Sequence, residues 1–279
     1  MKIRKNIIIP IGAIIILGLY LLFNNTGQIN YIIPDFTVLD VLKIDSISIN
    51  GPRGTIDLYS DNGIWKLNPD NLRAEPSKIN DMLSFLENPQ FIDMVSNTKN
   101  YQNYGLDNQY ITVKVKIENN ISDNSDRELY IGDLNNSGQF VFVRRPDNKA
   151  VFTVRKNIKN MFDVNDIDLI DKRILNFDTG KIDKIEIVSD NKITTLNKTV
   201  DSDSKDIWRS ERGLDLDTLD VDQSLRYLAN SRFDSYSSGL ALYEDKNLFQ
   251  LNLYEKEIIQ SFTLIRKNEG NYDAISTFT

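Results

Sequence analysis

Residues 44–67, IDSISINGPRGTIDLYSDNGIWKL, read as two β-hairpins in succession and decide the fold. Apolar and polar residues alternate on the two sides of Gly51-Pro-Arg-Gly54, the first predicted turn. Asp61-Asn-Gly63 is the second, because Asn and Gly tolerate the positive φ angles of a tight hairpin turn. The stretch therefore predicts the start of an antiparallel sheet, whose third strand carries Trp65.

The period of the apolar residues changes after these hairpins. Ile79, Met82, Leu83 and Leu86 follow the i, i+3, i+4, i+7 spacing of an amphipathic helix, and Asn88-Pro89 ends it. Alternating segments then return and predict four further strands, at residues 111–117, 128–131, 140–144 and 151–154. The sequence thus predicts an α+β unit with one helix packed on antiparallel strands.

The same order of elements recurs farther along the chain. The matched segments are 182–187 with 44–49, 192–196 with 55–59, Trp208 with Trp65, 221–233 with 79–91, Gly239-Leu240 with Gly105-Leu106, and 249–253 with 113–117. A shared order of strands, Trp and helix face predicts two tandem copies of one β-rich unit. We expect a first lobe at residues 25–177 and a shorter second lobe at residues 178–279. Residues 164–178 contain no Gly and no Pro, so the lobes should be packed rather than loosely tethered.

The N-terminus carries the longest apolar run, IIIPIGAIIILGLYLLF at residues 7–23, after Lys2, Arg4 and Lys5. Its length suits one transmembrane helix, and the preceding cations place the N-terminus in the cytoplasm. A cleaved signal peptide and a buried core helix are the alternatives, but no small-x-small cleavage site follows the run. Residues 1–24 are therefore predicted to be a cytoplasmic start and a signal anchor, with the rest of a single-pass cell-membrane protein extracytoplasmic.

The amino-acid composition limits the chemical functions that the protein can perform. The net charge of −7 disfavours a nucleic-acid partner, and the absence of Cys excludes disulfides and a lipoprotein anchor. The absence of His removes the commonest general base and the commonest ligand of zinc, copper and iron. No phosphate-binding loop and no nucleophile with a base at suitable spacing is found. We predict no enzymatic activity, no cofactor, no metal and no catalytic residue.

Several polar or aromatic groups have two interpretations. Residues 201–206, DSDSKD, suggest a calcium loop but lack the Gly and the Glu of an EF-hand, so a solvated loop is favoured. Asp220 with Gln223 resembles a helix capping box rather than a metal site. Trp65 and Trp208 are interpreted as core residues rather than a sugar platform. The basic pairs Arg144-Arg145 and Lys172-Arg173 could meet an anionic partner, although such pairs are usually solvated surface.

A set of short motifs follows Trp65 and the predicted helix. In order, they are Tyr104-Gly-Leu-Asp107, Leu129-Tyr-Ile-Gly-Asp133, Phe140-Val-Phe-Val-Arg144, Val151-Phe-Thr-Val154 and Leu169-Ile-Asp-Lys-Arg-Ile-Leu175. This order resembles the family called domain of unknown function 4340. The resemblance implies one N-terminal membrane helix and an extracytoplasmic region. It also implies association with ABC-type export systems of the gliding-motility kind, and it brings no established catalytic residues.

Two functions from different classes remain. The first is a membrane-anchored extracytoplasmic accessory or scaffold protein that contacts an ABC-type permease or another envelope protein. Its candidate partner-docking turn is Tyr104, Gly105, Leu106 and Asp107, beside exposed sheet edges. The alternative is a surface-tethered module that binds glycan or peptide in a cleft between the lobes. A third, less favoured function is an envelope hydrolase that uses two carboxylates.

Overall fold

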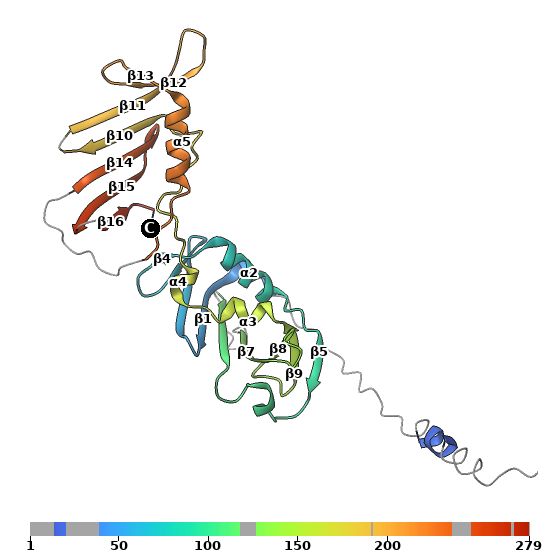
Figure 1. The fold of residues 1–279 in the computed structure, drawn as a ribbon. Coiled ribbons are helices and arrows are strands. Elements are labelled where there is room, and N and C mark those ends of the chain that lie inside the picture. Colours follow the sequence, from blue (N-terminus) through green and yellow to red (C-terminus); the bar gives the residue numbers. More distant parts are fainter. Residues whose placement is uncertain are drawn as a thin grey trace, which may run out of the picture.

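The chain forms two antiparallel sheets that lie end to end (Figure 1). The structure is a computed structural model that describes residues 14–20, 39–117, 127–190, 192–235, 247–268 and 271–278. Within these residues the fold is mixed α+β and consists mostly of strands, as the alternating segments predicted. The last described residues return to the region between the two sheets (Figure 1).

The first lobe contains a nine-stranded sheet with the order β4-β3-β2-β1-β6-β7-β8-β9-β5. Its strands are β1 (Ile44–Gly51), β2 (Gly54–Asp61), β3 (Ile64–Leu67), β4 (Leu72–Arg73), β5 (Asp93–Ser96), β6 (Ile111–Ile117), β7 (Arg127–Leu134), β8 (Phe140–Arg144) and β9 (Val151–Arg155). Its helices are η1 (Val41–Lys43), α2 (Pro76–Glu87), η2 (Gln102–Tyr104), α3 (Asn157–Phe162) and α4 (Asp166–Leu169).

The second lobe contains a seven-stranded sheet with the order β13-β12-β11-β10-β14-β15-β16. Its strands are β10 (Lys184–Ser189), β11 (Lys192–Val200), β12 (Asp206–Ser210), β13 (Asp215–Leu216), β14 (Asn247–Glu255), β15 (Glu257–Asn268) and β16 (Asn271–Ser276). One helix, α5 (Thr218–Ala229), follows β13 as α2 follows β4. From β13 to β16, the strands have the same spatial order as the strands from β4 to β8 in the other sheet. The predicted order of elements is therefore confirmed in both halves.

The two Trp residues occupy equivalent places in this order. Trp65 in β3 pairs with Ser60, and Trp208 in β12 pairs with Lys198. Trp208 is completely buried, and Trp65 is half-buried against the core of the first lobe. Trp208 is therefore a core residue, as predicted, and Trp65 packs against the core while part of it stays exposed.

The predicted match between the second strands of the two halves is wrong by one residue. In the first sheet Ile47 pairs with Leu58, and in the second the equivalent Ile185 pairs with Leu196. Leu196 therefore corresponds to Leu58, whereas the sequence match assigned it to Tyr59. A one-residue shift moves a side chain to the other face of a sheet, and the pairing keeps both leucines on the core face.

The match between β6 and β14 is wrong by two residues. Val115 lies opposite Ile47, and Leu253 lies opposite Ile185, so Leu253 corresponds to Val115 and not to Ile117. A shift of two residues preserves the face of every side chain, because the side-chain period of a strand is two. Apolar alternation alone could therefore not detect this error.

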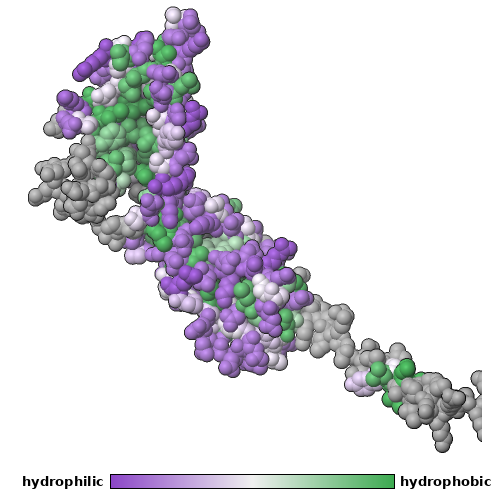
Figure 2. Space-filling view, in the orientation of Figure 1, coloured by the Kyte–Doolittle hydropathy of each residue, from purple (hydrophilic) through white to green (hydrophobic). Residues whose placement is uncertain are grey.

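The two helices begin and end at equivalent positions but differ in burial. In α2, Ile79, Met82, Phe85 and Leu86 are buried, whereas in α5 only Leu225 is. α3 adds Ile158 and Phe162 to the core of the first lobe, and among the described residues the second lobe has no equivalent helix. Apolar residues of the second sheet consequently remain only partly buried, namely Ile187, Leu196, Phe249 and Leu264. Figure 2 shows apolar side chains over this sheet beside α5.

Two local predictions are confirmed and one is corrected. Asp61 pairs with Ile64 across the predicted hairpin turn, with positive φ at Asn62 and Gly63. Residues 201–205 are a loop between β11 and β12 in which the Asp201 carboxylate accepts from backbone N–H groups, and Asp206 begins β12. The cap of α5 is Asp217, which accepts from the Leu219 N–H at 2.9 Å, so Asp220 lies inside the helix and does not form the predicted capping box.

The N-terminal prediction falls largely outside the described residues. Residues 14–20 are helical and mostly exposed, but this helix is part of a predicted span that begins at residue 7 and ends at residue 23. Among the described residues no helix is both long and apolar enough to cross a membrane. The polar stalk at residues 24–30 and the Gly239-Leu240 match also lie outside the described residues.

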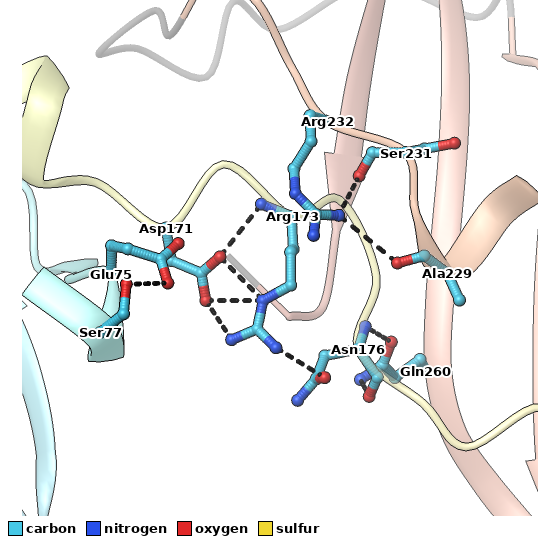
Figure 3. A network of polar contacts seen from close by, with 9 residues as sticks. All are labelled: Glu75, Ser77, Asp171, Arg173, Asn176, Ala229, Ser231, Arg232 and Gln260. Atoms are coloured by element: carbon cyan, nitrogen blue, oxygen red, sulfur yellow. Dashed lines mark hydrogen bonds and ion pairs between the residues drawn. The ribbon is translucent and has the colours of Figure 1, made fainter.

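The lobes are joined by residues 171–176, which we call the joint, and Figure 3 shows its polar contacts. The Asp171 carboxylate, only 2% exposed, accepts from the Arg173 backbone N–H at 3.1 Å and from its guanidinium, with Nε at 2.9 Å. Asp171 also donates its backbone N–H to Arg73 in β4, and Lys172 accepts from Phe233. The linker is therefore hydrogen-bonded to both lobes, and close packing of the lobes on one another stays a prediction.

The C-terminal Phe278 packs into the same joint. Its ring lies 4.5 Å from the guanidinium carbon of Arg73 in the first lobe and 5.2 Å from that of Arg173. Only 8% of Phe278 is exposed, and the Ser276 hydroxyl donates to the carbonyl of Ile174. Burial of a ring between two cations from different segments stabilises one relative orientation of the lobes.

Asp171→Asn is expected to loosen this orientation. The amide cannot accept the full set of charge-assisted bonds from Arg173, so the joint should lose about 1–2 kcal/mol. Small-angle scattering should show a broader distribution of distances, and trypsin should cut faster after Lys172. Asp70→Asn, at an exposed turn outside the joint, is the control. Unchanged scattering and unchanged cleavage would show that Asp171 does not fix the lobes.

The capping box of α4 gives a pH prediction near the joint. The Asp168 carboxylate accepts from the Asn165 backbone N–H at 3.1 Å, which lowers the pKa of Asp168 below its ordinary value of 3.8. Since the folded pKa is depressed, the stabilisation is present above the unfolded pKa and is lost as the pH falls through the folded one. Carboxyl NMR titration should therefore place the Asp168 midpoint below the ordinary value of 3.8. A midpoint at or above 3.8 would contradict the cap.

Candidate functional site

The predicted docking turn lies at one end of the first sheet, between η2 and β6. η2 is followed by Gly105, whose φ of 62° lies in the left-handed region that favours glycine. Leu106 is 1% exposed and anchors the turn, so it is unavailable to a partner. Tyr104 is half-buried, and Asp107 is exposed and accepts from the Asn108 amide at 3.1 Å. Of the four predicted residues, only Tyr104 and Asp107 offer side chains at the surface.

The turn packs directly on β7. A Cβ atom at Gly132 would lie 2.2 Å from the Tyr104 carbonyl oxygen, and one at Gly105 would lie 2.3 Å from the Asp133 carboxylate. The pairing of β7 with β8 is irregular between Ile131 and Leu134, next to this contact. The motifs that contain Gly105 and Gly132 are thus two sides of one close backbone contact, which explains why each contains a glycine.

A polar cleft of about 460 Å³ opens beside the turn. Its lining comes from the β1–β2 turn, the segment before β6, the end of β7, and α3 with its C-cap: Pro52, Gln102, Gly105, Asp107, Asn108, Gln109, Ile111, Asp133, Lys159 and Asp163. Lys159 donates to the Gly132 carbonyl at 2.7 Å and lies 3.4 Å from Asp133. Arg53 pairs with Asp163 at 2.6 Å. The cations are thus held by neighbouring acceptors, whereas the Asn108 amide is the only partner of Asp107 within the described part of the chain.

The outer face of the first sheet, opposite α2 and α3, carries an aromatic cluster next to the turn. Tyr104 meets Phe142 edge-on at 4.9 Å, and Tyr110 meets Tyr130 at the same separation. The guanidinium carbon of Arg144 lies 4.2 Å from the ring of Tyr101 and 4.3 Å from that of Tyr130. We call these six side chains the tyrosine shelf; they are Tyr101, Tyr104, Tyr110, Tyr130, Phe142 and Arg144.

Burial sets the protonation of the shelf. Burial, followed by the charge of Glu128, raises the pKa of Tyr130, so its phenol stays neutral at physiological pH. A neutral ring keeps the electron-rich face that attracts the Arg144 guanidinium. Tyr130 is therefore suited to hold the cation in place rather than to exchange a proton with it.

The shelf is not recognisable as a unit from the sequence. Arg144 and Arg145 were expected to be a solvated basic pair, whereas Arg144 lies between two rings and Arg145 pairs with Asp147. The strand alternation does indicate the outer face: Tyr130, Phe142 and Arg144 alternate with residues buried on the core face, so they lie on the opposite face of the sheet. Aromatic residues at such positions indicate a surface that is covered or used.

Carboxylates gather at the cleft but not as a metal site. Among the described residues no group of three or more Asp or Glu side chains is placed to hold a metal ion. The arrangement instead presents fixed rings, one stacked guanidinium and amide groups around a rigid turn. These groups suit hydrogen-bonded and charge-assisted contacts with another polypeptide.

Comparison with known proteins gives one match. The sequence model described as Domain of unknown function (DUF4340) matches residues 65–253, which include the turn, the shelf and the joint. No curated protein and no solved structure matches the chain. The matched residues make up about two thirds of the sequence. The chain therefore belongs to the DUF4340 family, as its motifs indicated.

Proposed function

We propose that the protein is a membrane-anchored extracytoplasmic accessory or scaffold protein that acts by binding another protein. The apolar run at residues 7–23 supports an anchor, and the cations before it support an outward-facing body. The motif resemblance favours an ABC-type export or envelope system, with a permease of such a system as the partner. The protein would contribute position and contact rather than a chemical step.

The observation that carries the proposal is the tyrosine shelf with its adjoining turn. Tyr and Arg are the residues that most often dominate binding energy at protein interfaces, because they offer large contact area with little loss of side-chain freedom. Here they are fixed by one another and by the close contact at Gly132. A surface that is already ordered binds with a smaller entropy cost.

The remaining architecture supports the same mode of action. A membrane anchor would confine the body to the partner's compartment and raise its effective concentration there. The joint stabilises one orientation of the two lobes, so contacts made by one lobe would position the other. The second lobe would add the partly buried apolar surface of its sheet.

A tethered module that binds glycan or peptide is the second candidate, and the polar cleft favours it. Its amide and carboxylate groups, including Gln102, Asn108 and Asp107, can hydrogen-bond to hydroxyl or amide groups of a ligand. The site would then lie in the first lobe, because Phe278 and the Asp171–Arg173 pair occupy the joint. We favour protein binding, since the shelf offers more aromatic area than the cleft.

Two measurements test the first proposal. An alkaline phosphatase fused at Thr279 should be active, because that enzyme folds only outside the cytoplasm; an inactive fusion with an active cytoplasmic reporter at the same place would contradict it. A photo-crosslinking residue at Asp107 should join the protein to a permease or another envelope protein. The same residue at exposed Asp70 is the control. Equal yields from the two positions, or no adduct from Asp107, would count against docking at the turn.

A further inference from the structure

Arg144 is held in an unusual way for an outer-face arginine. Its guanidinium carbon lies about equally far from the rings of Tyr101, in the segment before η2, and Tyr130, in β7. The side chain is half-buried, and Arg144 is the last residue of β8, where it pairs with Tyr130 of β7. Stacking on two rings fixes the plane of the guanidinium group and removes most of its rotamer freedom.

The charge of Arg144 has no counter-ion in the described part of the chain. Its Nη1 donates only to the carbonyl of Arg145, at a long 3.4 Å, and none of the ion pairs found there includes it. Its Nε is buried and has no hydrogen-bond acceptor. Leaving a buried donor of a charged group without an acceptor is costly, so this arginine is incompletely satisfied in the free protein.

The outer face of the four strands around Arg144 carries more cations than carboxylates. The charged residues on the outer face of β6 to β9 are Lys114, Lys116, Glu128, Arg144 and Arg155. The only carboxylate among them, Glu128, lies 3.5 Å from Lys114. These four strands therefore carry more cations than carboxylates on this face, although the chain as a whole has a net charge of −7 and Asp93 of β5 adds a carboxylate at the edge of the same face. Charge complementarity therefore favours an acidic group on the partner.

We propose that Arg144 is the anchor point for a carboxylate of the partner protein, an Asp or Glu side chain that enters the shelf beside Tyr101 and Tyr130. A carboxylate matches the planar fork of a guanidinium and can accept two parallel hydrogen bonds. The flanking rings exclude water and strengthen the ion pair. Tyr104 and Tyr110 border the site and contact the residues next to the acidic one. The inference rests on the proposed function and specifies the chemistry of its partner.

The direct test uses the full chain in detergent micelles, labelled with 3-fluorotyrosine. The probes are Ac-Gly-Glu-Gly-NH2 and its neutral isostere Ac-Gly-Gln-Gly-NH2. The fluorine signals of Tyr101 and Tyr130, assigned with Tyr→Phe variants, should shift saturably with the Glu peptide and not with the Gln peptide. The affinity should fall as salt is raised, because ions screen the attraction between the free peptide carboxylate and Arg144 before they associate. Equal shifts with both peptides, or none with the Glu peptide at about 50 mM, would overturn the proposal.

Variants of Arg144 distinguish the contribution of its positive charge from that of its planar guanidinium shape. Arg144→Gln should weaken the Glu peptide at least about tenfold, and Arg144→Lys, which keeps the charge but not the fork, should have an intermediate effect. Arg155→Gln removes an exposed cation from the same face and should leave affinity within about twofold. The fluorine signals of the remaining tyrosines report whether each variant is folded. An Arg144→Gln protein that is folded and binds as tightly as the wild type would also overturn the proposal.

The same variants distinguish this inference from the proposed function. If crosslinking from Asp107 reaches an envelope protein with equal yield in wild type and in Arg144→Gln, the docking function stands and the carboxylate anchor is wrong. If the Thr279 fusion proves cytoplasmic while the Glu peptide still binds at Arg144, the site stands and the extracytoplasmic function is wrong.

Discussion

Trp208→Ala is expected to unfold the second lobe at temperatures and denaturant concentrations that the first lobe survives. Trp208 is completely buried, and its indole N–H lies 3.4 Å from the Asp222 carboxylate on α5. It connects β12 to the single helix that covers this sheet. Replacing a buried Trp by Ala costs about 3–5 kcal/mol, which is a large share of the stability of a lobe of this size.

The duplicated architecture supplies a matched control. Trp65 lies at the equivalent position of the first sheet but is only half-buried, and its lobe has additional helices and strands. Trp65→Ala should therefore have the smaller effect. Because two lobes can unfold separately, urea unfolding should be followed by residue-specific hydrogen exchange rather than by one global signal. Loss of protection at β12 and β14 with protection retained at β1 and β6 is the expected result for Trp208→Ala. A larger effect of Trp65→Ala would contradict it.

The order of elements was predictable because it depends on patterns that recur. Trp65 and Trp208, the helix faces and the strand alternation keep one sequence order, and the two sheets keep one strand order. Helix boundaries also matched, since Pro76 and Thr218 begin helices of the same length. These features depend on local periodicity and on burial of one face, which the sequence carries directly.

Strand register was less predictable, for a physical reason. Leu196 was matched to Tyr59 instead of Leu58, because the turn between β10 and β11 carries no Gly-Pro signal that would mark its ends. Gly51 pairs with Gly54 and Ser189 pairs with Lys192, so the two turns in fact have the same length. Register is set by turn geometry and cross-strand pairing, and neither is visible in a single strand. Asp217 was missed as the cap of α5 because the acidic series offered several candidates at similar spacing.

The sequence located the turn but did not predict which residues pack around it. The motif that contains Tyr104 identified the turn, yet the partners of that turn come from β7 and β8, far along the chain. No local pattern connects Tyr101 with Arg144, because the contact depends on how a loop folds over the outer face of the sheet. Long-range contacts of this kind follow from the tertiary fold, so the sequence named several participants without pairing them.

Gly132→Ala is expected to displace the docking turn and abolish the tyrosine shelf. A Cβ atom there would lie 2.2 Å from the Tyr104 carbonyl oxygen and 2.9 Å from Cγ of Leu106, and both groups belong to the anchored part of the turn. The contact is with backbone, so no side-chain rotation can relieve it. Either β7 shifts or the turn leaves its place, at a cost of about 3 kcal/mol.

The test is to compare Gly132→Ala with Gly180→Ala in the joint-proximal turn. A Cβ atom at Gly180 would have no contact closer than 3.4 Å, so that variant should be close to neutral. In Gly132→Ala, the fluorine signals of Tyr101 and Tyr104 should move toward those of exposed tyrosines. The thermal midpoint of the first lobe should fall, and crosslinking from Asp107 should be lost. If the shelf signals and the crosslink both persist in Gly132→Ala, the turn is not held by β7, and the rigid surface on which partner binding is proposed does not exist in this form.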